Sequence, residues 1–166
     1  PPPEGPATRT NRLGVAVFSA VAGVLCLTAV IYGVTEMNSE ALAAERNATN
    51  ALVVEVTGQQ WVWTFNYPSL GIQSDVLNLP VGKPVKFVVK SVDVNHSFWP
   101  VQLGVKADAN DVVAVEINTT PNKIGHLDVK CAELCGLYHA YMETNGEVMA
   151  QNDFEKWVTD NGGHNA

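Results

Sequence analysis

The chain has 166 residues, of which 46% are hydrophobic and only 16% are charged, and its net charge at pH 7 is −7. This length is enough for one domain and an appended segment. From residue 36 onward the sequence contains 16 acidic and 8 basic residues. Such an acidic surface argues against nucleic-acid binding, which needs basic patches. It favours a cationic partner, or it only keeps the domain soluble.

Two N-terminal segments come before the domain. Residues 1–12 are rich in proline and predict a disordered lead. Residues 13–35 contain no charged side chain. At ~1.5 Å per residue they would form a helix long enough to cross the ~30 Å hydrocarbon core of a bilayer. We therefore predict one transmembrane helix. Arg9 and Arg12 before it, against Arg46 after it, place the N-terminus in the cytoplasm and the following domain outside.

The remainder of the chain predicts a linker and a mainly β domain. Residues 36–50 are typical of a helical extension and a linker. Residues 51–166 contain about seven short strands separated by turns, one of them over residues 72–79, which indicates a β-sandwich or a Greek-key barrel. The apolar side chains change parity across Gly58, so we expect a β-bulge or a break there. Asn152 and Asp153 predict the N-cap of a short C-terminal helix.

One strand leads into the most informative part of the sequence. Leu127, Val129 and Cys131 share one parity, so the sulfur of Cys131 continues the core face if the first two side chains point inward. His126 has the opposite parity, and we expect it outside the site. The Cys131 thiol is therefore expected at the apolar edge of the domain, where a bound metal would be shielded from water.

Residues 131–142 contain two thiols, an imidazole and a thioether, from Cys131, Cys135, His139 and Met142. His96, which follows a predicted strand, is a fifth candidate ligand. Soft sulfur donors and imidazoles suit copper, whereas magnesium and calcium prefer oxygen. Five such groups exceed the four ligands of a tetrahedral zinc ion. Their number and kind indicate two copper ions that share two thiolates.

The same residues allow other interpretations. The two cysteines could form a disulfide in an oxidising compartment, although its loop would be very short. In a helix the four side chains would fall within ~80° of one face and could form a core stripe. Two cysteines and two histidines could also bind a single zinc ion. The third cysteine, Cys26, lies in the apolar segment and is expected to pack as a small hydrophobic residue.

Together these residues resemble a known family. Over roughly residues 51–160 the chain is similar to subunit II of haem–copper cytochrome c oxidases. The motif of residues 131–142, with Asp93 and His96 upstream, is similar to the family's pattern for the dinuclear copper centre called CuA. Three further segments resemble the family: Gln60-Trp61-Val62-Trp63, Leu103-Gly104-Val105-Lys106-Ala107-Asp108-Ala109 and Phe154-Glu155-Lys156-Trp157.

The resemblance implies a mainly β, cupredoxin-like Greek-key sandwich or barrel that follows one N-terminal transmembrane helix. It also implies a dinuclear copper cofactor with two bridging thiolates, one imidazole on each copper, a weak thioether ligand and a weak backbone carbonyl ligand. The residues in these roles would be Cys131 and Cys135, His96 and His139, Met142, and Glu133.

Two further roles are implied by the resemblance. The side chain of Glu133 would bind Mg or Mn at the interface with subunit I, which suits a hard cation. Trp61 would receive the electron from cytochrome c. The alternation of Trp61 and Trp63 with polar residues would by itself favour core packing. The implied partners are the haem-bearing subunit I, other oxidase subunits, cytochrome c or a cytochrome c domain, and the membrane, with no nucleic acid. We expect a single-pass protein of the bacterial plasma membrane, with its C-terminal domain on the periplasmic side.

The implied function is electron transfer from cytochrome c through CuA to haem in subunit I of a respiratory terminal oxidase. The reduction of oxygen would take place in subunit I. The CuA subunit of a nitric oxide reductase would keep the same ligands and is an alternative. A membrane-anchored copper chaperone is another, but it would place its cysteines before its histidine. The sequence departs from the family in having one predicted membrane helix where two are usual, and Asn110-Asp111-Val112 where Pro-Gly-Arg is usual.

Overall fold

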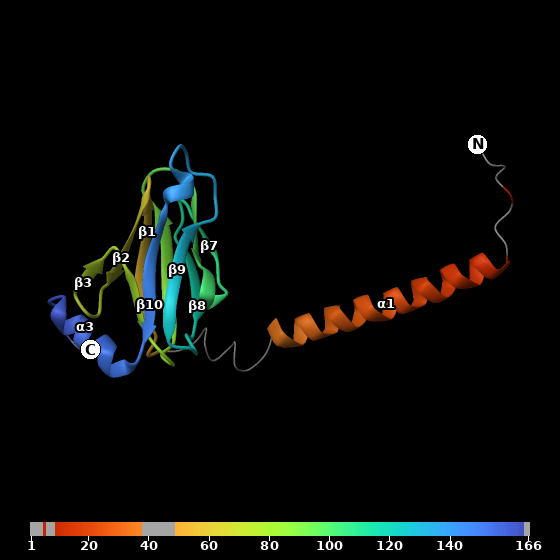
Figure 1. Cartoon of the computed structure of the whole chain (residues 1–166), viewed down its shortest axis with the longest axis horizontal. Coiled ribbons are helices and arrows are strands. Elements are labelled where there is room, and N and C mark those ends of the chain that lie inside the picture. The colour runs from red at the N-terminus through yellow and green to blue at the C-terminus, as the bar shows by residue number, and fades with distance from the viewer. Residues whose placement is uncertain (1–4, 6–8, 38–48, 165–166) are drawn as a thin grey trace. The chain divides into compact units, whose positions relative to one another are not determined.

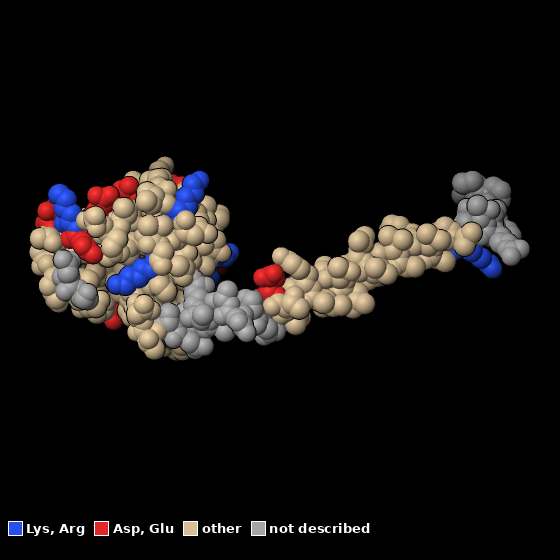
Figure 2. Space-filling model, turned by 90° about the horizontal axis from the view of Figure 1, so that it is seen from below, with Lys and Arg blue, Asp and Glu red and all other residues tan. Residues whose placement is uncertain are grey.

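The computed structural model describes residue 5, residues 9–37 and residues 49–164. The chain divides into an N-terminal unit, residues 1–44, and a domain, residues 45–166. The N-terminal unit contains helix α1 (Arg9–Met37). Among the described residues, α1 alone is long and apolar enough to cross a membrane, over Arg12–Glu36. The visible surface of α1 between its two ends carries no acidic or basic side chain (Figure 2).

Helix α1 is longer than the predicted transmembrane segment. It begins at Arg9, inside the predicted lead, and ends at Met37. The hydroxyl groups of Thr28 and Thr35 donate hydrogen bonds to carbonyl oxygens one turn earlier in the helix, at 2.9 and 2.8 Å. These polar groups are therefore satisfied within α1, as a lipid environment requires. Most of the predicted linker, residues 36–50, lies outside the described residues.

The domain consists of two five-stranded sheets (Figure 1). The strand order is β3-β2-β1-β5-β8 in the first sheet and β4-β10-β9-β6-β7 in the second. Strand β1 pairs in parallel with β5, and β10 pairs in parallel with β4, while the other neighbours are antiparallel. The strands are β1 (Leu52–Gln59), β2 (Val62–Tyr67), β3 (Ile72–Ser74), β4 (Leu77–Pro80), β5 (Val85–Ser91), β6 (His96–Pro100), β7 (Ala107–Ala109), β8 (Val115–Thr119), β9 (Gly125–Cys131) and β10 (Glu143–Met149).

The core lies between the two sheets, and an aromatic cluster joins them. Phe98 on β6 is fully buried. Its ring lies 5.7 Å from that of Trp63, 6.2 Å from that of Phe65 and 5.1 Å from that of Phe87, measured between ring centroids. These three rings come from β2 and β5 of the first sheet. Because burial of one large apolar side chain contributes about 1.5–3 kcal/mol, this cluster holds the sheets together directly beneath the end that carries His96.

The change of apolar parity near Gly58 is caused by a turn. Gln59 at the end of β1 pairs with Val62 at the start of β2, so Gln60 and Trp61 form a two-residue turn between antiparallel strands. The predicted break is confirmed, and the alternative of a bulge is wrong. The turn matters for function because it places Gln60 and Trp61 at the same end of the domain as the cysteines.

Two other expectations were wrong in detail. The single strand expected over residues 72–79 is two strands, β3 and β4, which belong to different sheets. The Ser74 hydroxyl bonds both the carbonyl and the N–H of Val76 and so shapes the crossing between the sheets. The final helix, α3 (Gln151–Asp160), follows Ala150, which provides no side-chain cap. The residues predicted to cap it lie inside its first turn, where the negative charge of Asp153 suits the helix dipole.

Candidate metal centre

The predicted ligand motif forms the end of β9 and the loop that joins it to β10. In Figure 1 this is the blue loop at the upper end of the domain. Cys131 ends β9, and a short 3₁₀ helix, η2 (His139–Tyr141), lies just before β10. The backbone N–H of Cys131 donates to the carbonyl of Met142 at 3.0 Å and closes the base of the loop. The segment is therefore not an α-helix, and the core-stripe interpretation is wrong.

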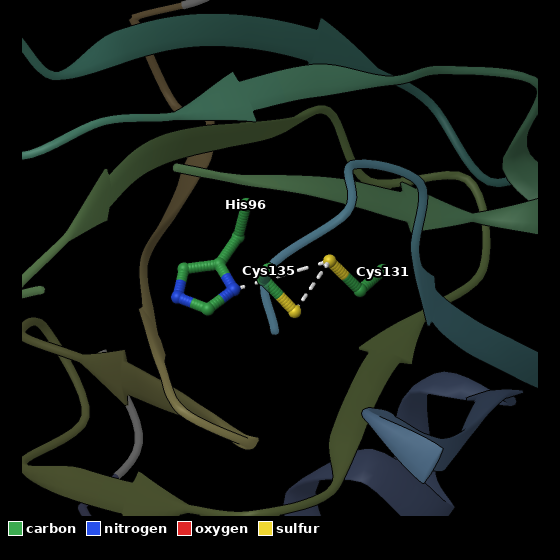
Figure 3. Close-up of side chains that lie close together, drawn as sticks. All are labelled: His96, Cys131 and Cys135. Atoms are coloured by element: carbon green, nitrogen blue, oxygen red, sulfur yellow. Dashed lines mark hydrogen bonds between the residues drawn. The ribbon is translucent and has the colours of Figure 1, made fainter. Parts of the chain in front are cut away.

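Strand pairing brings His96 to this loop. In the antiparallel register of β6 and β9, Phe98 lies opposite Cys131. His96 precedes Phe98 by two residues and so shares its face, which places the imidazole beside the first cysteine. The ring is fully buried, and Figure 3 shows it directed at the two sulfurs. Its Nδ1 lies 3.9 Å from the Cys131 sulfur.

The two cysteines are close but not bonded. Their sulfurs are 3.8 Å apart, far beyond the ~2.05 Å of a disulfide, and both cysteines are free and buried. One ligand-type atom from each of His96, Cys131 and Cys135 lies within 4.8 Å of the others. The arrangement therefore contradicts the disulfide interpretation.

Three more donors surround the sulfurs. The Nδ1 atom of His139 lies 3.5 Å from the sulfur of Cys135, and the sulfur of Met142 lies 3.6 Å from it. On the other side, the carbonyl oxygen of Glu133 lies 3.2 Å from the Cys131 sulfur. The structure thus brings together all six predicted ligand groups around one pair of thiols.

A carboxylate outside this set orients His96. Asp93 Oδ1 lies 2.8 Å from Nε2 of His96, which leaves Nδ1 facing the sulfurs. Metal-binding histidines commonly donate their second N–H to such a group, which fixes the tautomer and the ring. Partial burial acts to raise the pKa of Asp93. Hydrogen bonds from the Gln60 N–H, the His96 ring and the Val94 N–H outweigh it and lower the pKa to about 2.

Without a metal the Cys135 thiol retains its proton at neutral pH. Burial, followed by the proximity of Cys131, raises the pKa of the Cys135 thiol to about 11. A metal that binds as a thiolate complex must therefore displace protons. The low accessibility of both sulfurs also keeps water away from them, with Cys131 at 9% and Cys135 at 3% relative exposure.

The donor set fits a pair of copper ions. Two thiolates, two imidazoles and a thioether are soft or intermediate ligands, and they lie on both sides of the sulfur pair. A single tetrahedral zinc ion would use only four of them and would leave the buried Met142 sulfur without a role. The residues present would hold copper through Cys131, Cys135, His96 and His139, with Met142 and the Glu133 carbonyl at the periphery.

Trp61, Trp63 and the side chain of Glu133 lie around this centre, whereas His126 does not. Trp61 is half-buried, and its ring stands edge-on to that of Tyr138, with 4.8 Å between centroids. Trp63 is buried in the core. The side chain of Glu133 is exposed. His126 is exposed and bonds Asp128, away from the thiols, as its parity predicted.

Sequence reasoning missed two contributors to the site. Gln60 donates from Nε2 to the carbonyl oxygen of Cys135 at 2.7 Å. Gly58 lies against the back of His96, since a Cβ there would be 3.0 Å from the His96 ring and 3.1 Å from Trp63. Nothing in the spacing of either residue relates it to the motif. The role of Asp93 could have been inferred from its position three residues before His96.

Fold and site together define a cupredoxin-like domain with a cysteine–histidine centre at one end. Residues 70–148 match the family model described as cytochrome c oxidase subunit II, periplasmic domain. Cytochrome c oxidase subunit 2 of Thermostichus vulcanus is 45% identical over 111 residues, which are 66% of this chain and 33% of that protein. Subunit 2 of Synechocystis sp. is 35% identical over 120 residues, 72% of this chain and 36% of that protein.

A solved structure shows the same similarity at the level of the fold. The periplasmic domain of subunit II of cytochrome oxidase from Bradyrhizobium japonicum is 27% identical, with a TM-score of 0.63 over 69% of this chain and 95% of that one. The domain is thus similar to the periplasmic domain of cytochrome c oxidase subunit II in both sequence and fold. The chain spans about a third of the length of the two relatives. The predicted cupredoxin-like fold with one N-terminal apolar helix is confirmed.

Proposed function

We propose that this chain is the subunit that accepts electrons in a respiratory terminal oxidase, from cytochrome c through a dinuclear CuA centre to haem in subunit I. The observation that carries the proposal is the pair of unbonded, buried thiols 3.8 Å apart with an imidazole on each side. When bound by these residues, a copper pair would take up and release one electron. No substrate bond needs to change on this chain.

The protein's own residues supply a rigid, dry surrounding for that transfer. Asp93 holds the His96 ring, and the aromatic cluster around Phe98 fixes the strand that carries it. The base of the loop is closed by the bond between Cys131 and Met142. Ligands held in this way move little when the charge of the centre changes, which favours fast electron transfer. Burial of the sulfurs and hydrogen bonds near them tune the reduction potential.

An exposed apolar surface around the centre supports docking of protein partners. Leu134, Leu137, Tyr138 and Tyr141 all lie on the ligand loop, and their relative exposures are 79%, 82%, 50% and 77%. Contiguous exposed apolar side chains of this kind mark interaction sites. The acidic surplus of the sequence suits a basic cytochrome c, and Trp61 at the edge of this surface is the proposed point at which the electron arrives.

The exposed carboxylate of Glu133 is proposed to bind Mg or Mn together with subunit I. Its backbone carbonyl faces the Cys131 sulfur while its side chain is exposed, so one residue can serve both metals. We further propose that α1 anchors the chain in the bacterial plasma membrane as a single span, with the domain on the periplasmic side.

Metal content and electron spin resonance of the full chain test the proposal. The chain, reduced and loaded with copper in detergent micelles, is expected to bind two copper ions and to give the spectrum of one unpaired electron shared between them. Cys135→Ser should abolish that spectrum, whereas Cys26→Ser, a control in α1, should preserve it. One copper per chain would favour a chaperone, and a single zinc ion or a disulfide in the loaded protein would refute the proposal.

The role of Trp61 needs a separate measurement. Trp61→Phe is expected to slow reduction of the copper centre by cytochrome c in stopped-flow experiments, while the copper spectrum stays the same. Trp99→Phe, at an exposed position on β6, is the control. Unchanged rates in Trp61→Phe would remove this residue from the path.

A further inference from the structure

The turn between β1 and β2 touches the ligand loop at its centre. Gln60 Nε2 donates to the carbonyl oxygen of Cys135 at 2.7 Å, across 75 residues of sequence. Next to this bond, a Cβ on Gly136 would lie 2.9 Å from the same Nε2 and 3.3 Å from the Trp61 ring. The loop therefore passes over Gln60 and Trp61 in close contact, at a residue with a φ of +122° that glycine adopts readily.

The same residue reaches the other ligand-bearing segment. The backbone N–H of Gln60 donates to Oδ2 of Asp93 at 2.7 Å. Oδ1 of Asp93 lies 2.8 Å from Nε2 of His96. Gln60 is thus connected by its side chain to the segment that carries Cys135 and His139, and by its backbone to the carboxylate that orients His96.

The ligand loop has few other attachments. Its hydrogen bonds at residues 131 and 132 anchor only the base, to Met142 and Ser97. The bonds of His139 and Tyr141 return to Gly136 and Tyr138 within the loop itself. Among the residues that the structure describes, one hydrogen bond joins residues 133–138 to another part of the domain. It is the bond that the Gln60 side chain donates to Cys135.

We propose that Gln60 is a positioning residue that fixes the ligand loop relative to His96, and with it the contact between the loop and Trp61. This inference rests on the proposed copper site. We call this side-chain hydrogen bond of Gln60 the clamp. It would hold the Cys135 and His139 donors in place relative to His96, which belongs to a different strand. It would also keep the edge-on contact of Trp61 with Tyr138, the neighbour of His139.

Gln60→Met tests the clamp in the full chain. Methionine has nearly the length of glutamine but no N–H donor, and the exposed position tolerates it. The copper-loaded variant should lose copper to a chelator roughly two- to ten-fold faster than the wild type, the range that one neutral hydrogen bond gives. Its copper hyperfine pattern should also change. Gln60→Glu, which keeps the size but cannot donate to the carbonyl, should show the same or a larger effect.

A second measurement does not depend on copper. In the metal-free Gln60→Met protein, the His139 and Tyr141 amides should exchange with deuterium two- to ten-fold faster, because the loop opens more often. The matched control is Gln102→Met. Gln102 also makes two hydrogen bonds, to Asp128 at 2.6 and 2.8 Å, but it follows the opposite end of β6 from His96.

The outcomes separate the two proposals. If the wild type binds a copper pair but Gln60→Met loses copper and exchanges amides at wild-type rates, the clamp is refuted while the copper site stands. Equal effects of Gln102→Met would also overturn it, since they would reflect general destabilisation. If the wild type binds no copper pair, the proposed function fails, and unchanged amide exchange in the metal-free variant would refute the clamp as well.

Discussion

Removal of the Asp93 carboxylate is expected to weaken copper binding through His96. In Asp93→Ala, the Nε2 atom of a fully buried ring loses the partner that now lies 2.8 Å away. An unsatisfied buried donor costs about 1–3 kcal/mol. The N–H groups of Gln60 and Val94, at 2.7 and 2.6 Å, lose their acceptor as well, although both lie at exposed positions where water can replace it.

The expected size of the effect follows from these contacts. Loss of such a supporting group typically lowers metal affinity by about 10- to 100-fold, which corresponds to about 1.4–2.8 kcal/mol. We expect that loss for copper in a chelator competition assay. Urea denaturation of the metal-free protein should show a decrease of about 1–3 kcal/mol in the free energy of unfolding.

Asp128→Ala is a matched control. Asp128 also bonds a histidine, His126, at 3.2 Å, but that imidazole is 58% exposed and lies outside the site. Water can replace the carboxylate there, so stability should change by less than about 0.5 kcal/mol and copper affinity should not change. If Asp93→Ala keeps wild-type copper affinity, or if both variants lose affinity equally, the carboxylate does not act by holding His96.

Two further predictions concern the fold. Burial raises the pKa of Tyr67, whose hydroxyl bonds the backbone of Asn78 at 3.0 Å, far above its ordinary value of about 10. Tyr67 therefore ionises at a lower pH in the unfolded chain than in the folded one. The contribution of the protonated Tyr67 hydroxyl to stability is complete below pH ~10 and is lost as the pH rises further. The free energy of unfolding should therefore fall less steeply between pH ~9 and ~11 in Tyr67→Phe than in the wild type. An unchanged slope of unfolding free energy against pH would refute this. Gly146→Ala would place a Cβ on the carbonyl oxygen of Leu77 and force β4 away from β10. We expect a loss of about 3 kcal/mol or more by urea denaturation. Asn145→Ala, at an exposed position on the same strand, is the control. If Gly146→Ala is as stable as this control, the close packing of Gly146 on Leu77 is contradicted.

Much of the candidate site could be predicted because the chemistry of its donors is local. Cys131, Cys135, His139 and Met142 lie within one loop, and their soft donor atoms predict a copper site before any fold is known. The alternation of Leu127, Val129 and Cys131 also predicted correctly that the first thiol faces the core, since parity is a property of a single strand. What parity could not predict was the form of the loop, and a helix at these positions would have clustered the same side chains.

Long-range features were beyond the sequence pattern because they depend on which strands pair. The residues expected to form one strand over 72–79 divide between two sheets, since the bend at Ser74 depends on a hydroxyl bond to Val76 rather than on apolar periodicity. Likewise, the sequence around Gln60 indicates only an ordinary polar turn residue. Its bond to Cys135 exists only because the β1–β2 turn and the ligand loop meet at one end of the two sheets.

The sequence by itself determined the donor types, the apolar helix and the alternation that builds a β domain, because each of these depends only on residues that are close together in the sequence. The tertiary structure alone decided that His96 reaches the thiols, through the pairing of Phe98 with Cys131. It also decided that Asp93 and Gln60 support them. The physical reason is that hydrogen bonds between residues 33 and 75 positions apart in the sequence form only after strand register has brought their atoms within about 3 Å.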